Sequence, residues 1–437
     1  MRVLRGCVAG TLLLAAMVSP LSAQPAGMRL EGPPGCFMTC QGTQLMLQGQ
    51  PMGHLGLNKP DLPAYYRAGR HQERLAAGDL LGGLRRRGFR VLRVELAPPG
   101  PAELEQMLMD DPQPLQAYLK GLDDMLADCE DHGMLLVCSL MPLEHWADLG
   151  HHSLGEAMRN PHSPGRLKGE QFIREIVTRY NRRTIIIAWE IGPEYNLAAD
   201  LQSPQGPLAS CEDDPQWQRQ HVRPVVRDGR NNFTSDELAE FIAQEARLIR
   251  SIDVHHLISA GHAAPRREAM HLLRACREAK PPQWHDDSLD EQVRYLQLIN
   301  PDPVDIISVC HFEMTPTRLV LLKSAGDQLG KPLVVSRAGL CEPWIKPPCY
   351  DNLQAVELVR SQMPVLRELG IPLTLYWKYA DLSAGQPPDG QPPDGRAQDP
   401  AAVQLPEHCL QAGATDEVLD LMSQFNQPSP SAAQARQ

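Results

Sequence analysis

Short apolar runs alternate with longer amphipathic segments along most of the chain. Eight of the short runs are rich in Val, Ile and Leu, and apolar runs of this length between turn residues are typical of buried strands. They cover residues 53–58, 89–96, 134–140, 184–191, 256–260, 305–311, 332–337 and 372–378. Strands that alternate with helices predict a parallel sheet, and a set of eight predicts a closed (β/α)8 TIM barrel.

The longer segments carry apolar residues at helical spacing, and several end in a glycine or a basic last turn, which are helix-stop signals. Clear examples cover residues 72–88, 115–133, 169–183, 235–253 and 352–370. A short β-hairpin is expected at the N-terminus of the barrel, over residues 43–58. An open doubly wound sheet is the alternative fold, but no GxGxxG follows the first strand, which disfavours a dinucleotide-binding version.

The first 23 residues have the pattern of a secretory signal peptide. Arg2 and Arg5 precede an apolar stretch, and Leu21-Ser22-Ala23 is a small-residue cleavage site. The alternative is a membrane anchor, but the apolar core is short and no later segment has about 20 unbroken apolar residues. The sequence therefore predicts a secreted or periplasmic protein with a signal peptide at 1–23, a barrel at 24–426 and a disordered tail at 427–437.

Composition narrows the choice of partners. The 437 residues carry a net charge of −11, so there is no basic surplus to neutralise nucleic-acid phosphates. No CxxC pair with zinc spacing occurs, and no motif implies a metal or an organic cofactor. Cys138 and Cys310 lie inside strand-like runs and are expected to be buried thiols. The sequence leaves disulfide connectivity and oligomeric state open.

Polar and aromatic residues gather where the predicted strands end. Barrel enzymes collect their catalytic groups at the C-terminal ends of the strands, so these residues are expected to share one site. They are Arg93 and Glu95, Trp146, Glu190 and Glu194, His311 and Glu313, Arg337, and Trp377. Carboxylates, histidine and tryptophan suit sugars, because aromatic rings stack on pyranose faces and polar groups bind hydroxyls.

Several of these segments resemble the secreted cellulases and β-mannanases of glycoside hydrolase family 5, over most of residues 40–380. GFRVLRVEL resembles the second strand of the family and places its site arginine at Arg93. IIIAWEIGPE resembles the fourth-strand motif that presents the acid/base, here Glu194. DIISVCHF, KPLVVSRAG and LYWKY resemble the sixth, seventh and eighth strands, which implies sugar-binding roles for His311 and Trp377.

Three positions depart from the family pattern. Pro193 replaces the asparagine before the acid/base, Phe312 aligns with a site tyrosine, and Arg337 occupies the place of the nucleophilic glutamate. A retaining glycosidase needs two carboxyl groups about 5 Å apart. Arginine cannot attack a sugar, and its permanent charge stabilises the ionised form of Glu194, whereas a general acid must be protonated.

Three interpretations follow from the resemblance and its departures. The first is a hydrolase of β-linked O-glycosidic bonds with a rearranged site, in which Glu95, Glu313 or Glu342 supplies the second carboxylate. The second is a non-catalytic carbohydrate-binding protein that uses the same cleft. The third is a structural secreted barrel with an internal Arg337–Glu194 salt bridge. In the second interpretation Trp377 and Trp146 are the stacking platforms, and Arg337 contacts an anionic sugar or carboxylate. Arg93, His311 and Trp377 are the residues expected to line the cleft.

Overall fold

The computed structural model describes residues 37–201, 229–281, 284–311, 315–339, 352–377 and 416–427. Within these ranges no helix combines the length and the apolar character needed to cross a membrane. The predicted signal peptide and most of the predicted tail lie outside the described residues.

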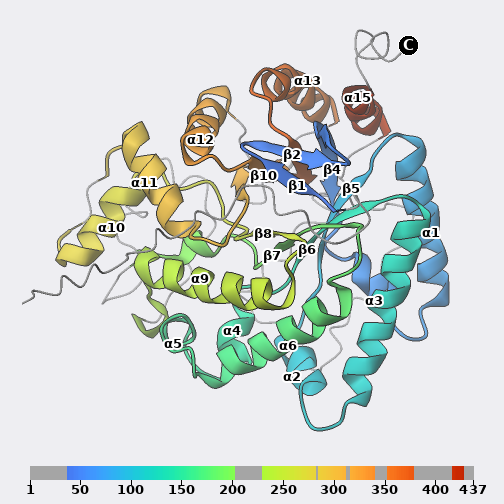
Figure 1. Cartoon of the computed structure of the whole chain (residues 1–437), viewed down its shortest axis with the longest axis horizontal. Helices are drawn as coiled ribbons and strands as arrows, with labels where there is room; N and C mark the ends of the chain where they lie inside the picture. The colour runs from blue at the N-terminus through green and yellow to red at the C-terminus, as the bar shows by residue number, and fades with distance from the viewer. Residues whose placement is uncertain are drawn as a thin grey trace, which may run out of the picture.

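Eight parallel strands form the centre of the molecule (Figure 1), and each lies within about two residues of a predicted run. Consecutive strands are neighbours, and the last pairs with the first. Backbone bridges from Ser259 to Ile306 and from Ala263 to Cys310 close the remaining gap, so the predicted (β/α)8 barrel is confirmed. The strands are β4 (His54–Asn58), β5 (Val91–Glu95), β6 (Leu135–Ser139), β7 (Ile186–Glu190), β8 (Leu257–Ser259), β9 (Ile307–His311), β10 (Leu333–Gly339) and β11 (Leu373–Trp377).

A helix follows every strand, and the helices surround the barrel (Figure 1). All five helices predicted from the sequence are present. The outer helices are α1 (His71–Arg86), α3 (Gln113–Asp131), α6 (Pro164–Tyr180), α9 (Ser235–Ile252), α11 (Leu289–Ile299), α12 (Pro316–Leu329), α13 (Asn352–Glu368) and α15 (Asp416–Asn426). Shorter helices α2 (Pro101–Met107), α4 (His145–Asp148), α5 (Leu154–Arg159) and α10 (Ala269–Glu278) lie in the connections.

Local sequence explains where several helices begin and end. Thr234 and Glu237 form a capping box at the start of α9, which satisfies two otherwise unpaired backbone donors. Gly88 and Gly133 follow α1 and α3 with φ of +87° and +63°, a left-handed conformation that glycine adopts without steric cost. Both glycines turn the chain directly into the next strand.

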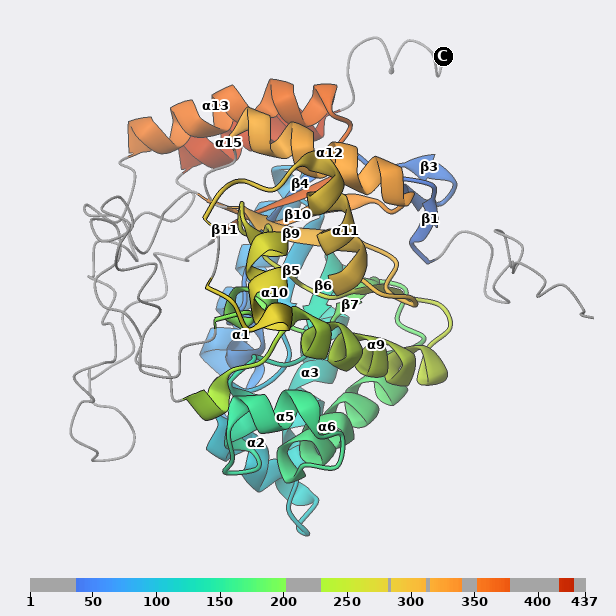
Figure 2. The ribbon, with the colours of Figure 1, turned by 90° about the vertical axis from the view of Figure 1, so that its left-hand side faces the viewer.

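A small antiparallel sheet precedes the barrel. It consists of β1 (Thr39–Gln41), β2 (Gln44–Leu47) and β3 (Gln50–Pro51). The expected hairpin therefore corresponds to β2 and β3, whereas residues 54–58 form the first barrel strand. Met38 and Leu45 belong to the same buried cluster as residues near the start of the barrel strands, such as Val91 and Leu373. The sheet thus covers the N-terminal end of the barrel with apolar side chains, at the right of the strands in Figure 2.

The cysteines expected in strands are buried free thiols. Cys138 and Cys310 make no disulfide, and burial raises the pKa of both. Cys40 is also a free thiol. These three cysteines therefore make no covalent contribution to the fold.

A fully buried ion pair joins α6 to α9. Arg166 Nε lies 2.6 Å from Glu245 Oε1, and neither side chain has exposed surface. The Arg166 guanidinium also lies 4.1 Å from the centre of the Phe241 ring. Burial raises the pKa of Glu245 to about 7, because it outweighs the opposing charge of Arg166.

This raised pKa predicts an unusual pH dependence of stability. The folded state holds a proton on Glu245 at pH values where the unfolded chain has lost it, so the contribution is largest at low pH and is lost as pH rises towards 7. Between pH 8 and pH 5 we expect the unfolding free energy of wild type to rise by at least about 1 kcal/mol relative to Glu245→Gln. Urea denaturation at several pH values measures this difference. Glu240→Gln changes an exposed residue on the same helix, so its unfolding free energy should depend on pH as that of the wild type does. The same pH dependence in Glu245→Gln and wild type would contradict the prediction.

Candidate active site

The C-terminal ends of β5, β7, β10 and β11 bring charged and aromatic side chains together. Arg93 and Glu95 are two residues apart on β5, so their side chains point to the same side of the strand. Glu190 ends β7, Arg337 lies on β10, and Trp377 ends β11. The apolar cluster with the N-terminal sheet lies at the other end of the barrel, so the polar groups are concentrated at the end where barrel enzymes have their sites.

The deepest contact is an ion pair between Arg93 and Glu190. Arg93 Nε lies 3.1 and 3.2 Å from the two Glu190 oxygens, and Nη2 lies 2.5 Å from Oε1. Both residues are 1% exposed. Burial alone would raise the pKa of Glu190, but the charge and hydrogen bonds of Arg93 lower it overall. Glu190 is therefore an ionised partner of Arg93 and unsuited to donating a proton.

Arg337 connects two further carboxylates at the mouth of the barrel. Its Nη2 lies 3.1 Å from Glu95 Oε1, and its Nη1 lies 3.4 Å from Glu194 Oε2. The guanidinium also lies over the Trp377 ring, 4.5 Å from the ring centre. Arg337 is 8% exposed. The internal salt bridge between Arg337 and Glu194 that the third interpretation invoked is present.

Arg93 links the two contacts into one network, because its Nη1 lies 3.0 Å from Glu95 Oε1. The order of charges is Glu190, Arg93, Glu95, Arg337 and Glu194, with three carboxylates and two guanidiniums. Glu95 and Glu194 keep about a quarter of their side-chain surface, at 27% and 25%. A ligand that entered the mouth would therefore meet these two carboxylates first.

The loop after β7 fixes the position of Glu194. Glu194 has φ of 59° and ψ of 24°, a left-handed conformation that is uncommon outside glycine and concentrated at functional sites. Its backbone N–H donates to Gly261 O at 2.8 Å. A side chain at Gly261 would collide with Gly192 O and Glu190 Cγ. The close packing of the loops after β7 and β8 thus sets the direction of the Glu194 side chain.

Tyr195 and Asn196 anchor the same loop, and sequence reasoning passed over both. Asn196 Oδ1 accepts from the Ala263 N–H at 2.8 Å, and its Nδ2 donates to Ala263 O at 2.9 Å. The Tyr195 hydroxyl donates to Met141 O at 2.5 Å. Both residues directly follow Glu194 in the sequence. Their position beside this motif is the signal that could have identified them.

Trp146 packs in the core beside this loop. Its side chain has no exposed surface, its Nε1 donates to the Tyr195 hydroxyl at 2.8 Å, and its ring meets Phe241 edge-on at 5.0 Å. A Cβ added at Gly169 would clash with the same ring. A ring without exposed surface cannot stack on a sugar unless this core rearranges.

His262 is a second residue that sequence reasoning did not single out. It follows β8, is completely buried, and its Nε2 lies 2.8 Å from Ile299 O. Burial lowers its pKa to about 4, although the Glu190 charge acts in the opposite direction. His262 is therefore neutral near pH 7 and supports the wall of the site.

Of three other expected residues, only the His311 backbone is described. It ends β9, where it is in register with Ala338. Glu313 and Glu342 lie outside the described residues. Their roles as alternative carboxylates stay predictions.

The arrangement limits the chemistry that the site can perform. Arg337 lies on β10, at the position where the resemblance to family 5 implies a nucleophilic glutamate. Since one guanidinium contacts both Glu95 and Glu194, their facing oxygens lie closer than the upper limit of about 9.5 Å for inverting pairs. Both carboxylates are, however, ion-paired to that guanidinium. Among the described residues, the group of side chains suited to a metal lies elsewhere, on α10 and α11 and the loop that joins them.

Comparison with known proteins identifies the fold. No family model matches the chain, and no curated protein matches its sequence. The chain is similar to a family 5 mannosidase from Rhizomucor miehei, with 14% identity and a TM-score of 0.58, over 90% of this chain and 98% of that chain. An endo-1,4-β-mannanase from the same organism is 14% identical with a TM-score of 0.55, over 79% and 91%. A β-mannanase from the blue mussel Mytilus edulis is 11% identical with a TM-score of 0.54, over 91% and 98%. The chain therefore has the fold of family 5 glycoside hydrolases.

Proposed function

We propose that the protein is a glycoside hydrolase-like protein that binds a β-linked poly- or oligosaccharide at the C-terminal end of its barrel. We further propose that it does not cleave that ligand by the retaining mechanism. The observation that carries the second part is Arg337, which occupies the nucleophile position and pairs with both Glu95 and Glu194. From the export pattern at residues 1–23 we also propose that the protein acts outside the cytoplasm.

The chemistry of Arg337 supports the loss of retaining hydrolysis. Covalent glycosyl transfer requires a carboxylate that attacks the anomeric carbon and a protonated partner that assists the leaving oxygen. Arg337 supplies no attacking group, and its guanidinium forms an ion pair with Glu194, the expected acid. Pro193 also disfavours retaining hydrolysis, because its side chain offers no donor to a sugar hydroxyl.

The charge network favours an uncharged sugar. Three carboxylates and two guanidiniums leave one surplus negative charge, and the partly exposed groups are Glu95 and Glu194. A sugar that carries a carboxylate would be repelled, whereas neutral hydroxyls can donate to both oxygens. A mutant of the R. miehei mannosidase forms a complex with mannosyl-fructose, an uncharged sugar. Mannose-containing ligands are therefore the first to test.

Affinity electrophoresis through soluble β-mannan and β-glucan tests the binding. We expect the wild type to be retarded by at least one of them, and Trp377→Ala to lose at least about tenfold in affinity, because truncation of a central aromatic residue commonly costs more than 1.4 kcal/mol. Trp284→Ala is a matched control, since Trp284 is 43% exposed on a loop outside the barrel. If the wild type is not retarded by any glycan, or if both variants behave alike, the binding proposal fails.

A second candidate function is inverting hydrolysis by Glu194 as acid and Glu95 as base. The observation that favours it is the placement of both carboxylates on one guanidinium, which keeps their facing oxygens below the upper limit of about 9.5 Å for an inverting pair. A panel of 2,4-dinitrophenyl glycosides separates the two functions, because these leaving groups need little protonation. Turnover by wild type that is lost in Glu95→Gln would support the inverting enzyme. Equal background rates for wild type, Glu95→Gln and Glu194→Gln would support binding without hydrolysis.

A further inference from the structure

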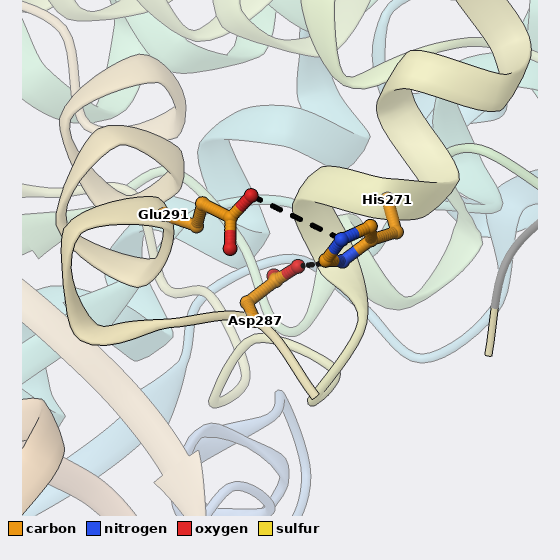
Figure 3. A group of neighbouring side chains, drawn as sticks. All are labelled: His271, Asp287 and Glu291. Atoms are coloured by element: carbon orange, nitrogen blue, oxygen red, sulfur yellow. Dashed lines mark hydrogen bonds and ion pairs between the residues drawn. The ribbon is translucent and has the colours of Figure 1, made fainter. Parts of the chain in front are cut away.

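We propose that His271 and Glu291 form a zinc-binding site on the outside of the barrel, with Asp287 orienting the histidine. His271 lies in the first turn of α10, Glu291 in the first turn of α11, and Asp287 in the loop between them. One ligand atom from each residue lies within 4.8 Å of the others. Figure 3 shows the two carboxylates beside the imidazole, each joined to it by a dashed line.

The hydrogen bond to Asp287 prepares His271 for a metal. His271 Nδ1 lies 2.6 Å from Asp287 Oδ1, and the other Asp287 oxygen accepts from the Met270 N–H at 2.8 Å and from Gln292 Nε2 at 3.1 Å. A carboxylate fixed in this way keeps the proton on Nδ1 and leaves the lone pair on Nε2. The same carboxylate–histidine pairing orients histidine ligands in zinc proteins.

The space beyond Nε2 fits a cation. His271 Nε2 faces Glu291 Oε1 at 3.9 Å (Figure 3), which is too long for a hydrogen bond. Two metal–ligand bonds of about 2.0–2.2 Å can span this gap. Glu291 Oε2 accepts from the Ser288 N–H and hydroxyl at 2.9 and 2.8 Å, so the carboxylate is held in place while Oε1 faces the histidine. Imidazole with carboxylate suits zinc better than calcium or magnesium.

The ring of His285 packs against that of His271 beside the site. Its ring centre lies 3.7 Å from that of His271, and the rings are tilted by 56°. His285 is exposed, whereas His271 is 8% exposed, so the site opens towards solvent on the His285 side. An ion can therefore enter without passing through the core.

Arg274 competes with a metal for Glu291. Its Nη2 lies 2.6 Å from the same Oε1 atom, but the Arg274 side chain is 41% exposed and can turn into solvent. An exposed ion pair contributes little to stability, less than two bonds to zinc. Removal of Arg274 should therefore tighten zinc binding, whereas a purely structural salt-bridge cluster predicts no binding in either form.

Titration of the folded chain with ZnCl2 by calorimetry tests the site. We expect one equivalent to bind to wild type, His271→Ala and Glu291→Gln to weaken binding at least about tenfold, and Asp287→Asn to weaken it about 10- to 100-fold. Ser288 and Glu291 form a capping box at the start of α11, and the Glu291→Gln variant can preserve it, so the helix is retained. Arg274→Met should bind more tightly than wild type. His71→Ala, an exposed histidine on α1, is the matched control and should not change the affinity.

Crystals soaked in ZnCl2 show directly where the ion binds, which calorimetry does not. Diffraction at the zinc absorption edge should show an anomalous peak between His271 Nε2 and Glu291. The absence of zinc binding by the wild type, equal affinity in His271→Ala, or a peak only at other surface histidines would each overturn the proposal.

Discussion

Replacement of Arg93 by methionine is expected to lower the free energy of unfolding by about 3–5 kcal/mol. The change removes the partner of Glu190, which is 1% exposed and makes three contacts with the guanidinium. An unpaired carboxylate at this depth must either stay charged in a poorly solvated place or take up a proton, and both cost stability. Urea denaturation at pH 7 measures the loss.

A double variant separates the effect of the lost ion pair on stability from the effect of lost packing. Arg93→Met with Glu190→Met removes both charges, and buried ion pairs can often be replaced by apolar residues at little cost. We therefore expect the double variant to be more stable than Arg93→Met alone. Arg90→Met is the matched control, because Arg90 lies in the same segment with an exposed side chain, and its effect should stay within about 0.5 kcal/mol. If Arg93→Met unfolds as easily as this control, Arg93 does not stabilise the barrel.

The barrel could be predicted because the local sequence pattern of each strand is enough to identify it. Runs such as 184–191 are apolar on both faces, and the glycines at 88 and 133 mark the turns that precede strands. The last outer helix, α15, could not be predicted in this way, since it follows a long polar segment. It is fixed by Asn426, whose amide exchanges two hydrogen bonds with the Leu55 backbone, a contact between opposite ends of the chain.

The members of the site could be predicted, but not their contacts. Arg93, Glu194 and Arg337 were expected at one end because parallel strands carry their C-termini to the same edge. The pairing of Glu190 with Arg93, and of Arg337 with two carboxylates, depends on long-range register. In particular, β10 is irregular around Ser336, where its register with β9 and β11 shifts. The burial of Trp146 likewise depends on Gly169 and Phe241, which lie on other helices.

The second large effect concerns activity. Arg337→Glu is expected to raise the turnover of at least one 2,4-dinitrophenyl β-glycoside by about 100-fold or more over wild type, the lower range for positioned acid–base groups. The change places a carboxylate on β10 across from Glu194, where the retaining mechanism needs its nucleophile. It also removes the guanidinium that pairs with Glu194. Repulsion among neighbouring carboxylates favours a proton on one of them, which is the state that a general acid requires.

Two further variants show whether the gain comes from a new nucleophile. Arg337→Gln removes the cation without adding a carboxylate, so its turnover should stay at the wild-type level. Arg337→Glu combined with Glu194→Gln should still form a glycosyl-enzyme from the activated substrate but should hydrolyse it slowly. A burst of dinitrophenolate close to one equivalent would then precede a slow steady state. Equal rates for Arg337→Glu and Arg337→Gln, with glycan binding retained, would mean that the identity of residue 337 is not what prevents hydrolysis.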